Sequence, residues 1–336
     1  MKLTVLVALL TLTSVAGTTA RYQPIAWSNE VSGKNFPLFA LIDADKAVRS
    51  AIASSSDLRA VLDAKRKAVA EAASTCAAVA ACHVAALSWS TDDIARVRDA
   101  LGALAKSGAL KSVIAAMRSS GLFVRDADLD DQAFVARSWE RAAAGVNNVL
   151  AVYGKGDKPR YPAIDSVAVD ATTPGYGRLV DTAMGLMSEQ AEKWDMFYQP
   201  SLALALRLLD INWRDEVGRH EPMHLGENAA AYKRVANVKW SEFPYTVALV
   251  PGAGLSDDME KENHAISPMG KQIIEIAARR YFDHKVAFII VSGGYVHPKY
   301  TRFAEAVEMK CALIPKSFQS RGGATDAIPT CVSAAP

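Results

Sequence analysis

Two short glycine-rich segments contain the residues best suited to bind a small molecule. Gly252 and Gly254 follow one apolar run of the sequence, and Ser292, Gly293 and Gly294 follow a second one. Because glycine has no Cβ atom, a ligand can approach its backbone closely and bind its N–H group. We therefore expect these five residues to form the binding site for a ligand or cofactor.

The first segment matches only part of the glycine fingerprint of dinucleotide-binding proteins. Asp257 stands where the third glycine of that fingerprint belongs, and no acidic residue ends a second strand at the usual distance. A tight turn from strand to helix therefore explains Gly252 and Gly254 as well as contact with a ligand does.

Two titratable residues follow the second glycine segment, and we predict them to be the catalytic ones. His297 can exchange a proton near neutral pH, because an unperturbed histidine titrates at about pH 6.5. Glu305 is expected one turn into a helix that Thr301 caps, where the helix dipole favours a carboxylate. Such a carboxylate repels phosphate and suits a hydroxyl, an ammonium or a metal ion. The alternatives are a loop histidine bonded to the backbone and a solvated glutamate.

A third set of residues has the spacing of a zinc protease. His220, Glu221 and His224 match the pattern HExxH, in which both histidines lie on one face of a helix. Pro222 lies inside the required turn, and a proline in a helix interior costs about 3 kcal/mol. We therefore expect no metal site and keep the zinc protease only as a third hypothesis. No G-x-S-x-G segment is present to indicate a serine hydrolase.

The elements that must position the glycine segments are two strands, each followed by a helix. Residues 245–250 and 286–291 are short apolar runs, and residues 269–282 between them have apolar side chains at helical spacing. This alternation predicts a truncated, Rossmann-like parallel β-α-β-α unit, whose loops after the strands meet at one edge of the sheet. Because two strands alone form a marginal sheet, we expect the helical N-terminal region to cover them.

The larger N-terminal part of the chain is predicted to be mostly helical. Apolar residues recur at helical spacing from residue 43 to residue 153, and alanine is abundant throughout. Residues 22–45 contain two prolines and a glycine and are expected to be irregular.

Cys76 and Cys82 are the expected disulfide pair, because both lie in one alanine-rich stretch of a protein predicted to be exported. In a continuous helix six residues rise about 9 Å, whereas a disulfide needs Cα atoms within about 7 Å. We therefore expect the helix to break between Ala77 and Ala81. Free thiols are the alternative. A metal site is not expected, because His83 is the only nearby candidate ligand.

The first 20 residues indicate export from the cytoplasm. Lys2 precedes an apolar run over residues 3–15, and small residues follow at 18–20, as in a cleavable signal peptide. The alternative is an uncleaved membrane anchor, although the run is short for a membrane span. The formal net charge is +2, which gives no strong field to attract nucleic acid. We expect a periplasmic or extracellular protein without a stable membrane span after cleavage.

Several of these segments resemble the YdcF-like family, a domain of unknown function that also includes SanA and ElyC. The similar residues are VPGAGL after the first strand, Ser267-Pro268-Met269-Gly270 before the helix, and VSGGYVHP followed by Thr301, Glu305-Ala306 and Glu308-Met309-Lys310. The resemblance covers residues 221–310 and implies a Rossmann-like sheet, an extracytoplasmic location and a link to cell-envelope maintenance. It also implies a nucleotide-like or S-adenosylmethionine-like ligand, without implying a particular reaction.

These observations predict four parts: a signal peptide at 1–20, a mostly helical region at 21–239, an incomplete YdcF-like unit at 240–313 and an irregular tail at 314–336. The tail departs from the family pattern after Lys310, as a frameshifted or truncated chain would. Our first hypothesis is small-molecule binding, with or without catalysis, at the loops after the strands. The second is a non-catalytic envelope protein whose helical region contacts other envelope proteins.

Overall fold

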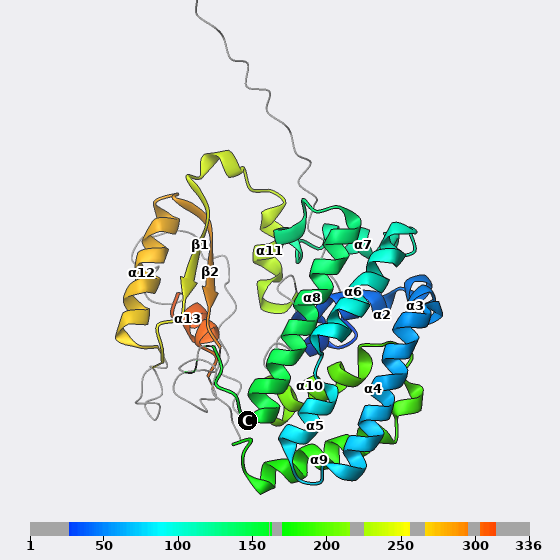
Figure 1. The fold of residues 1–336 in the computed structure, drawn as a ribbon. Helices are drawn as coiled ribbons and strands as arrows, with labels where there is room; N and C mark the ends of the chain where they lie inside the picture. The colour runs from blue at the N-terminus through cyan, green and yellow to red at the C-terminus, as the bar shows by residue number, and fades with distance from the viewer. Residues whose placement is uncertain are drawn as a thin grey trace, which may run out of the picture.

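The computed structural model describes residues 27–160, 162, 170–215, 225–255, 266–294 and 303–313. In this part of the chain, a bundle of helices lies beside a small two-stranded parallel sheet that has helices of its own (Figure 1). The fold is therefore mostly helical with a small α/β portion.

The helical region packs its amphipathic helices around one hydrophobic core. Helix α4, for example, buries Leu58, Val61, Leu62 and Val69, which share one helical face as their spacing predicts. A π-helical turn, η2 (Leu150–Lys155), directly follows α8. The helices of this region are α1 (Glu30–Asn35), α2 (Pro37–Ala44), α3 (Lys46–Ser54), α4 (Ser56–Thr75), α5 (Ala80–Leu87), α6 (Thr91–Lys106), α7 (Lys111–Ser119), α8 (Asp131–Val149), α9 (Pro174–Ser188) and α10 (Gln199–Ile211).

The segment before α3 is helical, so the expectation of an irregular stretch at residues 22–45 was wrong for its described part. The side chain of Asn29 caps α1 by accepting a hydrogen bond from the N–H of Ser32 at 2.8 Å. Pro37 begins α2, where a helix needs no backbone N–H and tolerates the ring. The residues that indicated a loop therefore mark the start of two short helices.

Aromatic rings fill the centre of the helical region. Trp139 of α8 is fully buried and lies 5.0 Å from Trp89 and 5.3 Å from Phe197, measured between ring centroids. Phe39 of α2 stacks on Tyr198 at 4.3 Å. Because these rings come from distant parts of the sequence, they join the early and late helices into one core.

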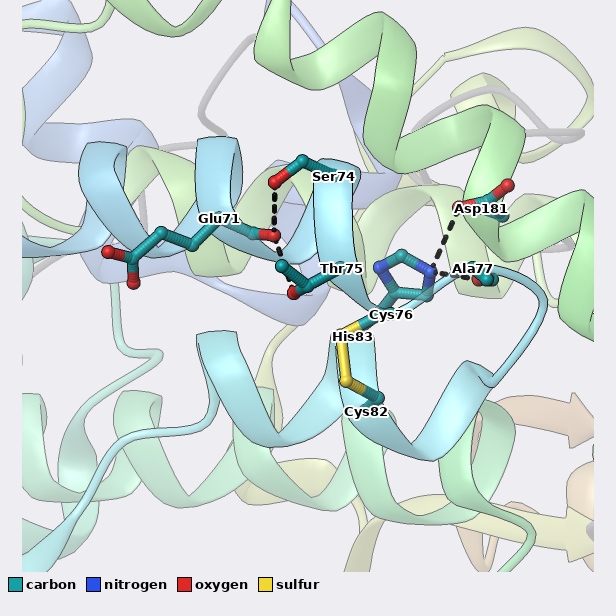
Figure 2. The surroundings of a disulfide bond; sticks show 8 residues. All are labelled: Glu71, Ser74, Thr75, Cys76, Ala77, Cys82, His83 and Asp181. Carbon is teal, nitrogen blue, oxygen red and sulfur yellow. Dashed lines mark hydrogen bonds and ion pairs between the residues drawn. A yellow bond between two sulfur atoms is a disulfide. The ribbon is translucent and has the colours of Figure 1, made fainter.

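The helix breaks between the two N-terminal cysteines, as predicted from the geometry of a disulfide. Helix α4 ends at Thr75, Ala77 has a φ of 46°, and α5 begins at Ala80. The break brings the Cα atoms of Cys76 and Cys82 to 5.5 Å, and the two residues form a disulfide (Figure 2).

A buried histidine ties this disulfide loop to helix α9. His83 is fully buried, and its Nε2 atom lies 2.8 Å from the backbone oxygen of Ala77 and 3.3 Å from a carboxylate oxygen of Asp181 (Figure 2). Both partners are acceptors, so Nε2 carries the hydrogen atom. Gly177 of α9 packs so closely that a Cβ atom there would lie 1.8 Å from the oxygen of Ala78. His83 therefore has a structural role at the junction of α4, α5 and α9.

The α/β portion follows the predicted order. Strands β1 (Tyr245–Pro251) and β2 (Val286–Ser292) pair in parallel, and α12 (Pro268–Phe282) connects them. Helix α12 covers one side of the sheet, and α13 (Glu305–Leu313) lies near the ends of the strands (Figure 1). A small cluster holds these elements together, consisting of Val250, Ile266, Ile274, Ala277 and Met309.

The second side of the sheet is open, which corrects the expectation that the helical region covers it. Tyr245 and Leu249 are 64% and 65% exposed, and Ile290, which pairs with Leu249, is 38% exposed. The helical region covers this side of the sheet only in part, because the buried cluster of the sheet is separate from the core of the helical region.

The short helix α11 (Ala229–Val235) approaches this open side at one point. Arg234 donates a hydrogen bond to the hydroxyl of Tyr281 at 3.1 Å and lies over the ring of Phe288. Trp240, which follows α11, also contacts Phe288, with ring centroids 5.9 Å apart.

Among the described helices, none is by itself long and apolar enough to cross a membrane. One bent pair, Ala80–Lys106 with Lys111–Ser119, meets the length and composition criteria when the two are taken together, with a 99° bend between them.

We expect removal of the Cys76–Cys82 disulfide to destabilise the helical region. The closed loop is short, with a sequence separation of 6, so the expected loss in the free energy of unfolding is about 2 kcal/mol. Denaturant unfolding of the Cys76→Ser/Cys82→Ser double variant, compared with the oxidised wild type, measures this loss. An unchanged midpoint would contradict the prediction.

We expect His83→Ala to lower the free energy of unfolding by about 2 to 4 kcal/mol, because it leaves a cavity at a fully buried position and removes the donor shared by Ala77 and Asp181. The matched control is His284→Asn, at an exposed turn with a positive φ of 53°. Asparagine tolerates that backbone conformation, so the control should change stability by less than about 0.5 kcal/mol. Equal losses in both variants, measured by urea denaturation, would show that His83 has no special structural role.

Candidate functional site

The two glycine segments lie side by side at one edge of the sheet. In the register of the two strands, Pro251 at the end of β1 pairs with Ser292 at the end of β2. The chain therefore leaves both strands at the same level, and Gly252 and Gly293 begin neighbouring loops. This is the arrangement that the sequence predicted for a binding site in an open parallel sheet.

The side chain of Glu305 lies between these two glycines. A Cβ atom on Gly252 would lie 2.1 Å from Oε2 of Glu305, and one on Gly293 would lie 2.9 Å from its Cβ atom. Any larger residue at either position would thus displace the glutamate. The absence of a side chain at Gly252 and Gly293 makes room for this carboxylate.

Glu305 is the first residue of α13, so it does not lie one turn into the helix as expected. Its N–H group donates to the oxygen of Gly294 at 3.2 Å, and the N–H of Ala306 donates to the oxygen of Gly293 at 3.0 Å. The second glycine loop therefore forms the backbone cap of α13. Thr301 precedes the helix start by four residues and lies outside the described residues.

The carboxylate of Glu305 is buried and has an oxygen without a hydrogen-bond partner in the described structure. The residue is 5% exposed, and its Oε1 atom has no hydrogen-bond partner among the residues that the structure describes. An unsatisfied buried acceptor costs about 1 to 3 kcal/mol, so such atoms are uncommon in folded proteins. The arrangement provides a buried acceptor that a ligand can satisfy.

Gly254 serves the turn after β1. Its φ of 88° is in the left-handed region that favours glycine, and no atom lies within 4 Å of a Cβ atom placed on it. Ser267, the N-cap of α12, donates its hydroxyl to Ala253 at 3.0 Å and its N–H to Gly254 at 3.1 Å. The turn alone explains Gly254. Its partner Ser267 was not predicted to be a site residue, although a serine before a proline is a recognisable signal for the start of a helix.

Several predicted residues cannot be placed. His297 lies outside the described residues, as do His220, Glu221 and His224 of the zinc-protease pattern. Ser292 is exposed at the end of β2. In the described ranges, no group of three or more histidine, cysteine, aspartate or glutamate side chains is arranged to hold a metal ion.

The helical region contains a hollow that the sequence did not indicate. Its volume is about 310 Å³, and it lies between α3, α4 and the chain before α10. The apolar side chains of Ile52, Leu62 and Phe197 line it, together with charged side chains that include Arg66 and Asp195. The guanidinium of Arg66 is already held by the backbone oxygens of Glu192 and Trp194.

Comparisons with protein-family models, with curated proteins and with solved structures gave no match to this chain.

The pKa of Glu308, one turn after Glu305, is raised above its usual value because the side chain is partly buried. A pKa that is higher in the folded state stabilises the protein below the usual glutamate titration range, and this contribution is lost as the pH rises through the folded pKa. Glu308→Gln stays neutral, so the wild type should lose stability relative to the variant between about pH 4 and pH 7. Urea denaturation of both proteins at the two pH values measures their free energies of unfolding. The same difference between wild type and variant at both pH values would contradict the prediction.

Proposed function

We propose that this chain is an exported, YdcF-like protein whose Rossmann-like unit binds a small polar or nucleotide-like ligand at the loops after β1 and β2. The observation that carries the proposal is the buried carboxylate of Glu305 between Gly252 and Gly293, with one oxygen left without a partner in the described structure. The parallel pairing of the strands and the resemblance in the loop sequences support the same edge of the sheet.

In this proposal each residue has a distinct role. Gly252 and Gly293 leave room for the carboxylate of Glu305 between the two loops, and Ser292 and Gly294 complete the second loop. Gly254 holds the first loop in its turn. Glu305 accepts hydrogen bonds, and His297 supplies a proton donor or acceptor if the ligand is transformed. A role in maintenance of the cell envelope belongs to the proposal through the resemblance alone.

A second candidate function is a non-catalytic envelope protein that works through its helical region. The hollow between α3 and α4 favours it, because a lining of both apolar and charged side chains is suited to binding part of another molecule. A zinc protease at His220, Glu221 and His224 is the third candidate, and metal analysis tests it directly: stoichiometric zinc would support it.

The proposal is tested by thermal unfolding of the full chain with adenosine, AMP, ATP and S-adenosylmethionine. A ligand at about 100 times its dissociation constant adds about 2.7 kcal/mol of stability, which raises Tm by several degrees. Gly293→Ala should abolish the shift, because its new Cβ atom would lie 2.9 Å from the Cβ of Glu305.

The matched control is Gly185→Ala in α9, where a new Cβ atom has nothing within 4 Å. It should keep the full response to the ligand. If no compound shifts Tm, or if both glycine variants respond like the wild type, binding at this edge of the sheet is wrong.

A further inference from the structure

We infer that Glu305 binds a hydrogen-bond donor of the ligand, either an ammonium group or a pair of hydroxyl groups, and that the N-terminus of α13 does not bind phosphate. This inference rests on the proposed function and specifies the chemical group that the site recognises. Four observations on α13 and its surroundings support it.

The first observation is that the N-terminus of α13 has no donor to offer an anion. The first four N–H groups of a helix usually lack partners and form a ready anion site. In α13 the N–H groups of Glu305 and Ala306 donate to Gly294 and Gly293, and those of Val307 and Glu308 donate to Ala304. All four are thus used by the protein itself, so a phosphate would find no free backbone donor at this helix end.

The second observation is the contrast between Glu305 and two carboxylates of the helical region that have side-chain donors. Asp43 receives the hydroxyl of Tyr198 at 2.7 Å, and Asp126 receives the guanidinium of Arg141 at 3.0 Å. Within the described residues no such donor reaches Oε1 of Glu305. The missing donor is what a ligand would supply.

The third observation is the charge around Glu305. A phosphate placed here would face the carboxylate of Glu305, whereas an ammonium would be attracted and hydroxyl groups would be tolerated. A bare metal ion fits less well, because the described residues offer no group of three ligands.

The fourth observation is the position of the carboxylate. Both of its oxygens lie within 3 Å of the place that a Cβ atom of Gly252 would occupy, while its stem packs on Gly293. A donor bound by Glu305 therefore lies between the two loops and contacts both. This places the specificity of the site at the junction of the loops, not at either loop alone.

The test uses four probes that share an adenine and a five-membered sugar ring. Adenosine has the hydroxyl pair, 2′,3′-dideoxyadenosine lacks it, 5′-amino-5′-deoxyadenosine adds an ammonium, and AMP adds a phosphate. Their dissociation constants are measured by calorimetry at fixed pH and ionic strength for the wild type, Glu305→Gln and the control Glu308→Gln. Glutamine keeps the size of the side chain and removes its charge.

We expect Glu305→Gln to weaken binding of adenosine, of the amino analogue or of both about tenfold or more, and Glu308→Gln to change it less than twofold. AMP should bind no more tightly than adenosine. A loss confined to the amino analogue identifies an ammonium as the donor. If the loss is seen with adenosine but not with the dideoxy compound, the hydroxyl pair is the donor.

Two results would overturn the inference while leaving the proposed function intact. One is that Glu305→Gln binds every probe as tightly as the wild type does, while Gly293→Ala binds none of them. The other is AMP binding more than about tenfold tighter than adenosine, which would show a phosphate site. If the wild type binds none of the four probes, the result counts against both the inference and the proposed function.

Discussion

The parallel pairing of β1 with β2 is the constraint on which the candidate site depends. Because Pro251 pairs with Ser292, the two chains leave the sheet at one level and their glycines become neighbours. A register shift of one residue would turn each side chain of one strand to the other face of the sheet. The small cluster around Ile274 and Met309 would then lose its packing, and Glu305 would no longer lie against both glycines.

The molecule distributes its buried surface unevenly between its two portions. The helical region has a large continuous core with stacked aromatic rings, and the disulfide and His83 fix the junction of α4 with α5 and α9. The α/β portion has a small cluster of its own and leaves one face of the sheet exposed. Since apolar burial is the main source of stability, the helical region supplies most of it, and the sheet supplies the candidate site.

The chemistry of the site follows from how its backbone groups are used. The carbonyl groups of Gly293 and Gly294 accept the first two N–H groups of α13, so the loop and the helix form one rigid corner. Ser267 holds the first loop in the same way from α12. With the first four N–H groups of α13 occupied, a buried polar atom left open at this corner of the described structure is a carboxylate oxygen, which is an acceptor. Acceptors recognise donors, and this simple complementarity limits the ligands that fit.

The sequence by itself determined the features that depend on local patterns. The apolar runs located both strands and α12 to within a residue or two. The reach of a disulfide predicted a helix break between Ala77 and Ala81, and in the structure α4 ends at Thr75 and α5 begins at Ala80. Only the tertiary structure decided that the carboxylate of Glu305 fills the space beside Gly252, that Asp181 reaches His83, and that Leu249 stays exposed. These features join segments far apart in the chain. Residue spacing specifies which face of an element is apolar, but it does not specify which distant element packs there.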